Sequence, residues 1–383
     1  MAVLFSLFVM FAGGLSIAGF IALVLWLGAR SRKRTAAELA ASVQALGLTL
    51  QGEHQASGVR DGIHVRLVLT TESRGSGKNR RTVRVTRYWA HFDPPLRMSL
   101  HVGEQTAFFG DLLDLAGLSN DIELGDPALD AALRIKALEP DHARAVLRAA
   151  DVQRAILAAC AAGSFSITDA HAFVQHDGWV TSQGGIASRL EPLWAVARGI
   201  AAARRQCRAS WEHAIDASWG GLAGTDGLAY DGARSWLGGR VGETTLDLSV
   251  QTERGALVTR ASATFAAPLG LGMQVYRTGL AQNLGKLFGA QDVQVGVAEF
   301  DALYTVKATD ADGVRSALAG GGAHALLQLQ SIASELTVDD AGVKVRVDGV
   351  LHDPRAVAML VRSLSSAATA MRPGGSVSIG AFR

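Results

Sequence analysis

The strongest constraint on how this chain folds is that it repeats itself. When it is shifted by 171 positions, residues 121–178 align with residues 292–349 without a gap, and 15 of the 58 pairs are identical. Upstream the match continues in a shifted register, since Phe92 and Val102 meet Phe265 and Val275. Such self-similarity indicates a duplicated domain, and two copies are too few for a solenoid, which needs three or more stacked units.

Each copy has the pattern of an α+β domain. Apolar residues alternate with others in 63–69 and 246–250, which is the period of a half-buried strand. Later in each copy the sequence predicts a long helix, a short hairpin and a final helix, at 140–161, 165–175 and Glu191-Pro192 in the first copy and at 311–333, 336–347 and Asp353-Pro354 in the second. We therefore predict an α+β fold class: an N-terminal transmembrane helix, then two tandem duplicated domains of antiparallel sheet packed with helices and related by a pseudo-two-fold axis.

The domain boundaries follow from these patterns. They are 1–29 for the transmembrane helix, 30–35 for a basic juxtamembrane segment, 36–205 for the first α+β repeat, 206–212 for a helical link, 213–372 for the second α+β repeat and 373–383 for a C-terminal tail.

The first 29 residues contain no charged side chain, and a helix needs roughly 20 apolar residues to cross a bilayer. The uncharged start and the length argue against a cleaved signal peptide. Because basic residues follow this stretch and none precede it, the sequence predicts a single-pass membrane protein with its N-terminus outside and both domains in the cytoplasm. Small residues recur at Ala12, Gly14, Ser16 and Ala18, which allows a homodimer through this helix, although such residues are common in membrane helices.

Charge and cysteine content exclude several classes of function. The net charge is +2, and Arg30, Arg32, Lys33 and Arg34 alone contribute +4, so the remainder is slightly acidic. No nucleic acid partner is expected, because nucleic-acid-binding domains are strongly basic. Cys160 and Cys207 have no metal-ligand or redox spacing around them, so we expect free thiols, no metal site and no cofactor.

The copies differ in length at two places. The first has eight more residues between Glu72 and Phe92, and a longer connection over 178–190. The extra hairpin tip carries basic residues that, with the juxtamembrane group, predict a surface for anionic lipid headgroups: Arg30, Arg32, Lys33, Arg34, Arg74, Lys78, Arg80, Arg81, Arg84 and Arg87. A solvated hairpin whose charges prevent edge pairing is an equal alternative. A third interpretation is nucleic-acid binding by this tip, with Tyr88 and Trp89 as stacking partners.

A duplicated active site would repeat its acids and bases. The best repeated pairs are Asp130 with Asp301 and Lys136 with Lys307. A carboxylate beside a lysine could act in acid–base catalysis, but a spacing of six residues does not bring the two together. We favour aspartates that cap turns or helices, and exposed lysines.

The remaining motifs predict no catalytic residue. Gly279–Lys286 has the wrong spacing for a phosphate loop, and there is no GxSxG, HExxH or GxGxxG in a strand-to-helix setting. His171 and His176 lie five apart on a predicted hairpin, hence on opposite faces, which makes them poor metal ligands.

Two equivalent segments carry a resemblance to known proteins. DIELGDPALDAALRIKA at 121–137 and DVQVGVAEFDALYTVKA at 292–308 resemble a stretch of uncharacterised bacterial proteins that join a membrane helix to an α+β domain of unknown function. The resemblance implies a bacterial inner-membrane protein and brings no activity or catalytic residue with it.

Three hypotheses of function remain. The first is a membrane-anchored cytoplasmic binding or scaffold module without catalysis. The second is a protein that binds a lipid or an apolar small ligand in a cavity. The third is an enzyme of unknown class that uses Asp130 or Asp301.

Overall fold

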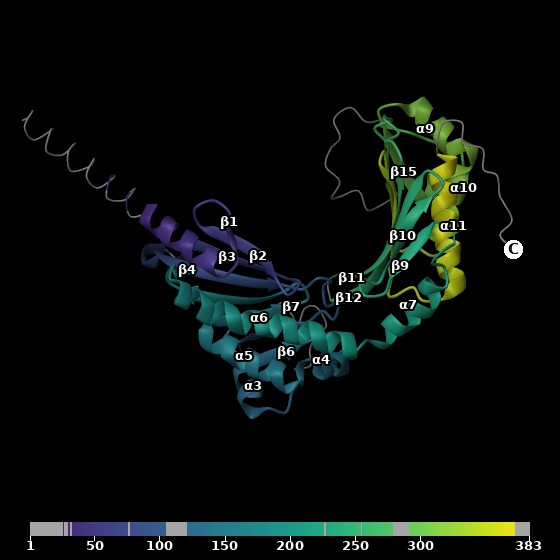
Figure 1. Ribbon diagram of the computed structural model, residues 1–383. Coiled ribbons are helices and arrows are strands. Elements are labelled where there is room, and N and C mark those ends of the chain that lie inside the picture. Colours follow the sequence, from purple (N-terminus) through teal and green to yellow (C-terminus); the bar gives the residue numbers. More distant parts are fainter. Residues whose placement is uncertain are drawn as a thin grey trace, which may run out of the picture. The chain divides into compact units, whose positions relative to one another are not determined.

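The protein, seen in a computed structural model, has two compact units. The structure describes Trp26, Arg30 and residues 33–75, 77–104, 121–225, 227–253, 255–278 and 291–371. The first unit contains most of the chain up to Gln206, and the second begins at Cys207 and also includes Arg97–Ser99. Each unit is described by itself below (Figure 1).

The first unit is built on one eight-stranded sheet whose neighbouring strands are all antiparallel. Its order is β1 (Thr49–Leu50), β2 (Gln55–Arg60), β3 (Ile63–Arg74), β4 (Arg81–His91), β8 (His171–Asp177), β7 (Ser164–Thr168), β5 (His101–Glu104) and β6 (Leu133–Lys136). A single turn of 3₁₀ helix, Gly77–Asn79, lies at the tip of the β3–β4 hairpin.

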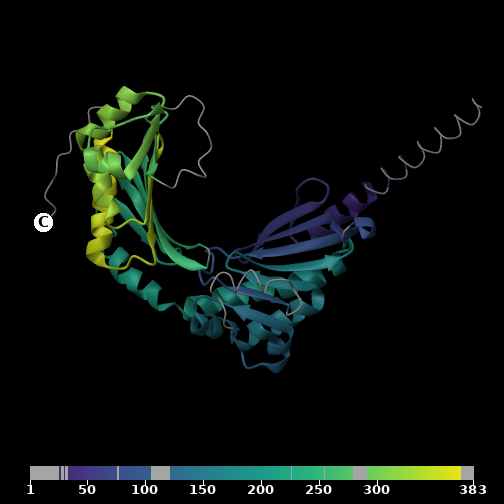
Figure 2. The same cartoon turned by 180° about the vertical axis from the view of Figure 1, so that it is seen from behind.

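Helices cover one face of this sheet. They are a helix over 33–45, α3 (Pro127–Ala132), α4 (Pro140–Leu147), α5 (Ala150–Ala162) and α6 (Gln183–Gln206). Alternate strand residues such as Val65, Leu67 and Tyr88 are buried, and α6 packs on β3, β4 and β8 (Figures 1 and 2). This alternation places the odd-numbered residues of β3 toward the helices and the even-numbered ones on the face turned away from α5 and α6, here called the far face.

The second unit has a nine-stranded sheet. Its order is β9 (Leu228–Asp231), β10 (Trp236–Val241), β11 (Thr244–Glu253), β12 (Ala256–Phe265), β17 (Gly342–Asp348), β16 (Glu335–Asp339), β13 (Gln274–Arg277), β15 (Tyr304–Ala308) and β14 (Gln291–Asp292). The helices are α7 (Ser210–Gly220), α8 (Ala298–Leu303), α9 (Ala311–Ala317), α10 (Ala323–Gln330) and α11 (Pro354–Ala370). α11 packs on β11, β12 and β17, so this sheet also has a far face, turned away from α11 (Figure 2).

The two sheets have the same strand order. Read from β1 and from β9, both run through a four-stranded meander, then the last hairpin of the unit, then two further strands, and β14 is added at the end of the second sheet. The predicted α+β class and the two similar antiparallel units are therefore confirmed. The pseudo-two-fold relation between them stays a prediction.

Several predicted helices have different bounds. The helix expected over 140–161 is two helices, because Ala149 leaves the helical conformation at ψ 127° between α4 and α5. In the second unit the equivalent stretch stays helical through a π segment, Leu318–Gly322. α6 begins at Gln183 with Pro192 inside it, so most of the long connection expected over 178–190 is helix.

The prediction of a transmembrane helix was wrong. Among the residues that the structure describes, no helix is long and apolar enough to cross a membrane. Even α6, with 24 residues, carries Arg189, Arg198 and Arg205 and is buried along one side only. This finding overturns the part of the predicted fold class that included a transmembrane helix, together with the predicted inner-membrane localisation and topology. Residues 1–29, on which those predictions rested, lie outside the described residues except for Trp26.

Candidate functional site

The repeated aspartates hold backbone turns in both units. In the first unit the Asp130 carboxylate accepts hydrogen bonds from the backbone N–H groups of Leu124 and Gly125, at 2.8 and 2.9 Å. In the second unit Asp301 accepts from Val295 and Gly296, at 2.9 and 2.8 Å. Both oxygens of each carboxylate are thus used to close the loop before a short helix.

Other repeated polar residues also bind backbone groups. The buried Thr86 hydroxyl donates to the Gly178 carbonyl at 2.7 Å and accepts from the Val180 N–H at 2.9 Å. Thr259 makes the same pair of bonds to Gly349 and Leu351, at 3.0 and 2.8 Å. Gly178 and Gly349 have φ of +94° and +78°, which favours glycine at the end of each hairpin.

The repeated lysines differ in burial. Lys136 is buried on β6, with 4% exposure, although we expected both lysines to be exposed. Lys307 is partly exposed on β15. The strand register places Lys136 beside His101 and Lys307 beside Gln274, on equivalent rows of the two sheets.

Three histidines form a row across the far face of the first sheet. His64 on β3 pairs with His91 on β4, and His91 pairs with His171 on β8. The centroids of successive imidazole rings lie 5.4 and 5.7 Å apart. The equivalent positions of the second sheet hold Thr245, Thr264 and Gly342, so the row exists in one unit only.

The next row on this face holds one arginine and two aromatic rings. Arg66 pairs with Trp89, and Trp89 pairs with Phe173. The two rings are tilted by 49° with centroids 5.3 Å apart, and the Arg66 guanidinium carbon lies 5.4 Å from the Trp89 centroid. We call the six residues of these two rows the His/Trp face: His64, Arg66, Trp89, His91, His171 and Phe173.

The same row of the second sheet carries different chemistry. Asp247 stands where the first unit has Arg66, and the register continues through Ser262 and Lys344. The Asp247 carboxylate accepts a hydrogen bond from the Trp236 indole. An arginine beside two rings is thus replaced by an acid, a hydroxyl and a lysine.

Burial affects the histidines of the His/Trp face. It lowers the pKa of His91, and the neighbouring His171, His64 and Arg66 lower it further. Burial also lowers the pKa of His171. Both imidazoles therefore favour the neutral form near pH 7.

Beyond these two rows the far face carries an ion-pair network. Arg87 pairs with Glu72 and donates from Nε to the Gln175 side chain at 2.9 Å. Arg74 pairs with Asp177 at 2.7 Å. By contrast Arg66 has no carboxylate partner among the described residues; it donates to Gln55 at 3.1 Å, and its Nε has no hydrogen-bond partner there.

The predicted lipid-headgroup residues do not form one uniform patch. Arg74 and Arg87 belong to the network with Glu72 and Asp177, an acid that the sequence places 90 residues beyond Arg87. On the hairpin, Arg80 donates to Ser73, Arg84 lies over the Trp179 ring, and Arg81 is exposed. In the juxtamembrane group, Arg30 is exposed, and Lys33 and Arg34 are exposed on the helix over 33–45. Arg32 lies outside the described residues. Lys78 is in the 3₁₀ turn at the tip. Contact with anionic headgroups stays a prediction, and the homodimer prediction rests on residues 12–18, also outside the described part.

The stacking pair suggested by the sequence is divided between the two faces. Tyr88 is fully buried toward the helices, and burial strongly raises its pKa. Trp89 lies on the far face, where its ring partner is Phe173. His171 and His176 do lie on opposite faces, as the register of β8 shows.

No group of three or more His, Cys, Asp or Glu side chains in the described part of the chain is placed to hold a metal ion. In the described part of the chain, neither Cys160 nor Cys207 forms a disulfide. Burial raises the pKa of the Cys160 thiol to about 11, so it is protonated near pH 7.

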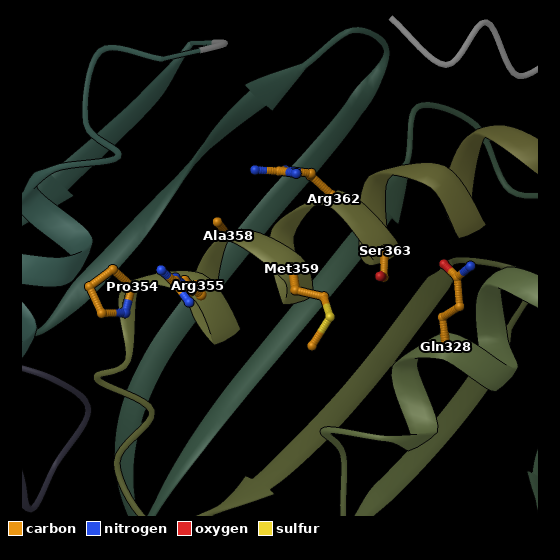
Figure 3. Close-up of a pocket in the computed structure, with 7 residues that line it drawn as sticks. All are labelled: Gln328, Pro354, Arg355, Ala358, Met359, Arg362 and Ser363. Carbon is orange, nitrogen blue, oxygen red and sulfur yellow. The ribbon is translucent and has the colours of Figure 1, made fainter. Parts of the chain in front are cut away.

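A groove lies on the helical layer of the second unit (Figure 3). It has a volume of about 540 Å³ and is lined by Gln328 of α10 and by Pro354, Arg355, Ala358, Met359, Arg362 and Ser363 at and along α11. Met359 is 47% exposed within it. It offers a reference site on the unit that lacks the His/Trp face.

Comparison with known proteins gives one distant structural neighbour. No family model and no curated protein matches the chain. It is similar to the crystal structure of the mycobacterial trehalose monomycolate transport factor A, with 15% sequence identity and a TM-score of 0.27. The likeness covers 43% of this chain and 96% of that one. The sequence resemblance to membrane-anchored bacterial proteins stays a prediction.

The sequence did not reveal the His/Trp face. Its residues come from three strands, and the 81 residues between Trp89 and His171 include other strands and helices. A signal was present, because positions 87, 89 and 91 alternate with buried Tyr88 and Ala90. Recognising the row also required the pairing of β4 with β8, which local patterns do not give.

Proposed function

We propose that the protein is a non-catalytic binding module whose ligand binds on the His/Trp face of the first unit. The observation that carries the proposal is the difference between two equivalent rows of two similar sheets. Arg66, Trp89 and Phe173 stand where the second unit has Asp247, Ser262 and Lys344. Partly exposed aromatic and arginine side chains are typical of binding surfaces.

The repeated polar residues support a binding role over catalysis. A duplicated enzyme would use its repeated acids in the reaction, but Asp130 and Asp301 use both carboxylate oxygens to accept backbone N–H groups. Thr86 and Thr259 are committed in the same way. The same side chains occur in both copies because each stabilises the same part of the fold.

Side-chain packing favours a surface site over an internal apolar pocket. Tyr88 in the first unit and Trp219 and Phe300 in the second are fully buried. In the second unit the rings belong to one continuous core that includes residues of β11, β12 and α11. Large rings at these positions fill the layer between sheet and helices.

Native mass spectrometry of the full chain tests the proposal. The matched variant is Trp89→Ser combined with Phe173→Lys, which gives the first sheet the residues that the second already has there. We expect the wild-type chain to carry an additional bound mass after purification from its host, and the variant to lose it. Arg355→Gln, in the groove of the second unit, should keep it.

Two results would contradict the proposal. A bound mass that the face variant retains and Arg355→Gln loses would place binding in the groove of α11. Turnover of any substrate that is abolished by Asp130→Asn or Asp301→Asn in a folded chain would establish the catalytic alternative instead.

A further inference from the structure

We propose that the His/Trp face binds a ligand in which a planar ring is joined to an anionic group, the combination that a nucleotide provides. This inference rests on the proposed function and specifies the ligand class of the same surface. Three features of the face support it: the two rings, an arginine that has no carboxylate partner within the described part of the chain, and the distance between the rings and this arginine.

The ring-binding element is the pair Trp89 and Phe173. Their centroids are 5.3 Å apart and their planes are tilted by 49°, so they offer two adjoining aromatic surfaces on adjacent strands at the centre of the sheet. Both side chains are partly exposed rather than buried with the core. Aromatic side chains on a sheet face stack on nucleobases and other planar rings.

The anion-binding element is Arg66. Arg74 and Arg87 on the same face are neutralised by Asp177 and Glu72, whereas Arg66 has no carboxylate partner among the described residues. Its guanidinium lies over the Trp89 ring, which holds the planar group in place. Because Nη2 donates to Gln55 and Nε is buried, Nη1 is the Arg66 nitrogen left to donate to a phosphate or carboxylate.

The spacing of the two elements suits a small ligand. Arg66 and Trp89 are direct partners across neighbouring strands, and neighbouring strands lie about 4.8 Å apart. A ring that stacks on one of these two side chains and contacts the other by its edge thus places a substituent group within reach of Arg66. His91 and His64, one row away, extend the same surface with polar ring nitrogens.

The second unit shows why this combination is selective. At the position of Arg66 it has Asp247, which would repel an anion, and at the positions of the rings it has Ser262 and Lys344. Since these residues are accepted at the same register of a similar sheet, they are the best substitutions for removing the site without disturbing the fold.

Isothermal titration calorimetry of the full chain tests the ligand class with four probes. Adenosine 5′-monophosphate has both ring and anion, adenosine lacks the anion, ribose 5-phosphate lacks the planar ring, and a ten-residue thymidine oligonucleotide has both in a strand. We expect adenosine and ribose 5-phosphate each to bind at least about tenfold more weakly than the monophosphate, because a charged hydrogen bond or a stacking contact is lost. The oligonucleotide distinguishes a single strand from a free nucleotide as the source of this chemistry.

The variants locate the site. Arg66→Asp should lose the difference between the monophosphate and adenosine, and Trp89→Ser with Phe173→Lys should lose binding of both. Arg355→Gln should bind as the wild-type chain does. Circular dichroism and thermal unfolding confirm that each variant is folded.

Several results would overturn the inference. Equal binding of adenosine and its monophosphate, or unchanged binding by the folded face variants, contradicts it. Binding to phosphatidylglycerol vesicles with no response to any of the four probes would assign the face to lipid headgroups. If no probe binds but the face variant still loses its bound mass in native mass spectrometry, the ligand class is wrong and the proposed function stands.

Discussion

The far faces of the two sheets share one backbone plan and carry different side chains. At equivalent positions one face has His64, Arg66 and Trp89, and the other has Thr245, Asp247 and Ser262. The strand order of the two sheets is the same up to the extra β14. The comparison teaches that one strand arrangement can carry two chemically different surfaces, and that the residues that differ between them are the ones to test for function.

The polar residues that are identical in the two copies lie elsewhere than on the far faces. Asp130 and Asp301 lie in the short helices α3 and α8, and Thr86 and Thr259 lie within strands β4 and β12. Each binds two backbone groups of a neighbouring segment. Equivalent substitutions at these sites should lower the stability of both units alike, whereas equivalent substitutions on the far faces should have different effects in the two units. The following predictions test that contrast.

The largest expected effect is on the buried threonines. Thr86→Val and Thr259→Val each leave a backbone N–H and a carbonyl without their partner. Each should therefore lower the free energy of unfolding by about 2 to 3 kcal/mol. Urea unfolding of each variant, followed by circular dichroism, measures the loss. Thr→Ser at the same positions keeps the hydroxyl and is the control. A large loss in one unit and none in the other would break the comparison.

A smaller loss is expected at the aspartates. Asp130→Ala and Asp301→Ala each remove the acceptor for two backbone N–H groups, one of which is exposed, so each should lower the free energy of unfolding by about 1 to 2 kcal/mol. Asn at either position keeps one oxygen acceptor and should recover part of the loss. Denaturant midpoints check this, and an effect near zero at both sites would contradict the structural role.

The histidine row should make the first unit sensitive to acid. The folded pKa of His91 lies below the ordinary value of about 6.5, so the unfolded chain takes up a proton first as pH falls. Stability is therefore full above about pH 6.5 and is lost as pH falls through the lowered folded pKa. His91→Thr, which introduces the residue of the second unit, should flatten the pH dependence of unfolding between pH 7 and 5. A dependence unchanged by this substitution would contradict it.

The smallest effect is expected for the partly exposed ion pairs that both units share. Arg87 pairs with Glu72, and Arg260 pairs with Glu253. Solvent screens these pairs, so Arg87→Gln and Arg260→Gln should each cost less than about 1 kcal/mol, and less still in 1 M salt. Thermal unfolding at two salt concentrations measures both, and a large loss that salt does not reduce would require another explanation.

The sequence predicted the parts of the fold that depend on periodicity and repetition. The duplication follows from the match between residues 121–178 and 292–349. The α+β class and the hairpins over 165–175 and 336–347 follow from patterns within a short window, and the strand pairings confirm the hairpins. Helix bounds were less predictable. Ala149 breaks one expected helix without a Pro or Gly, and Pro192 sits inside α6 rather than at its start.

The candidate site could not be predicted from local sequence patterns, because it depends on which strands pair. The difference in length between the two copies pointed to the hairpin tip at 72–92. The informative difference is one of side-chain chemistry at equal length, in residues such as Trp89 and Phe173 that meet only through the β4–β8 pairing. The predicted membrane helix was wrong, since no helix in the described part of the chain is long and apolar enough to cross a membrane.

Hydroxyl-radical footprinting of the full chain tests the central claim most directly. Rates of side-chain oxidation would be measured with and without the small-molecule fraction of the cells that make the protein, with Met359 on α11 as the exposed reference in the second unit. The account predicts that Trp89 and Phe173 become protected while Met359 does not. Protection of Met359 with unchanged oxidation of Trp89 and Phe173 would contradict it.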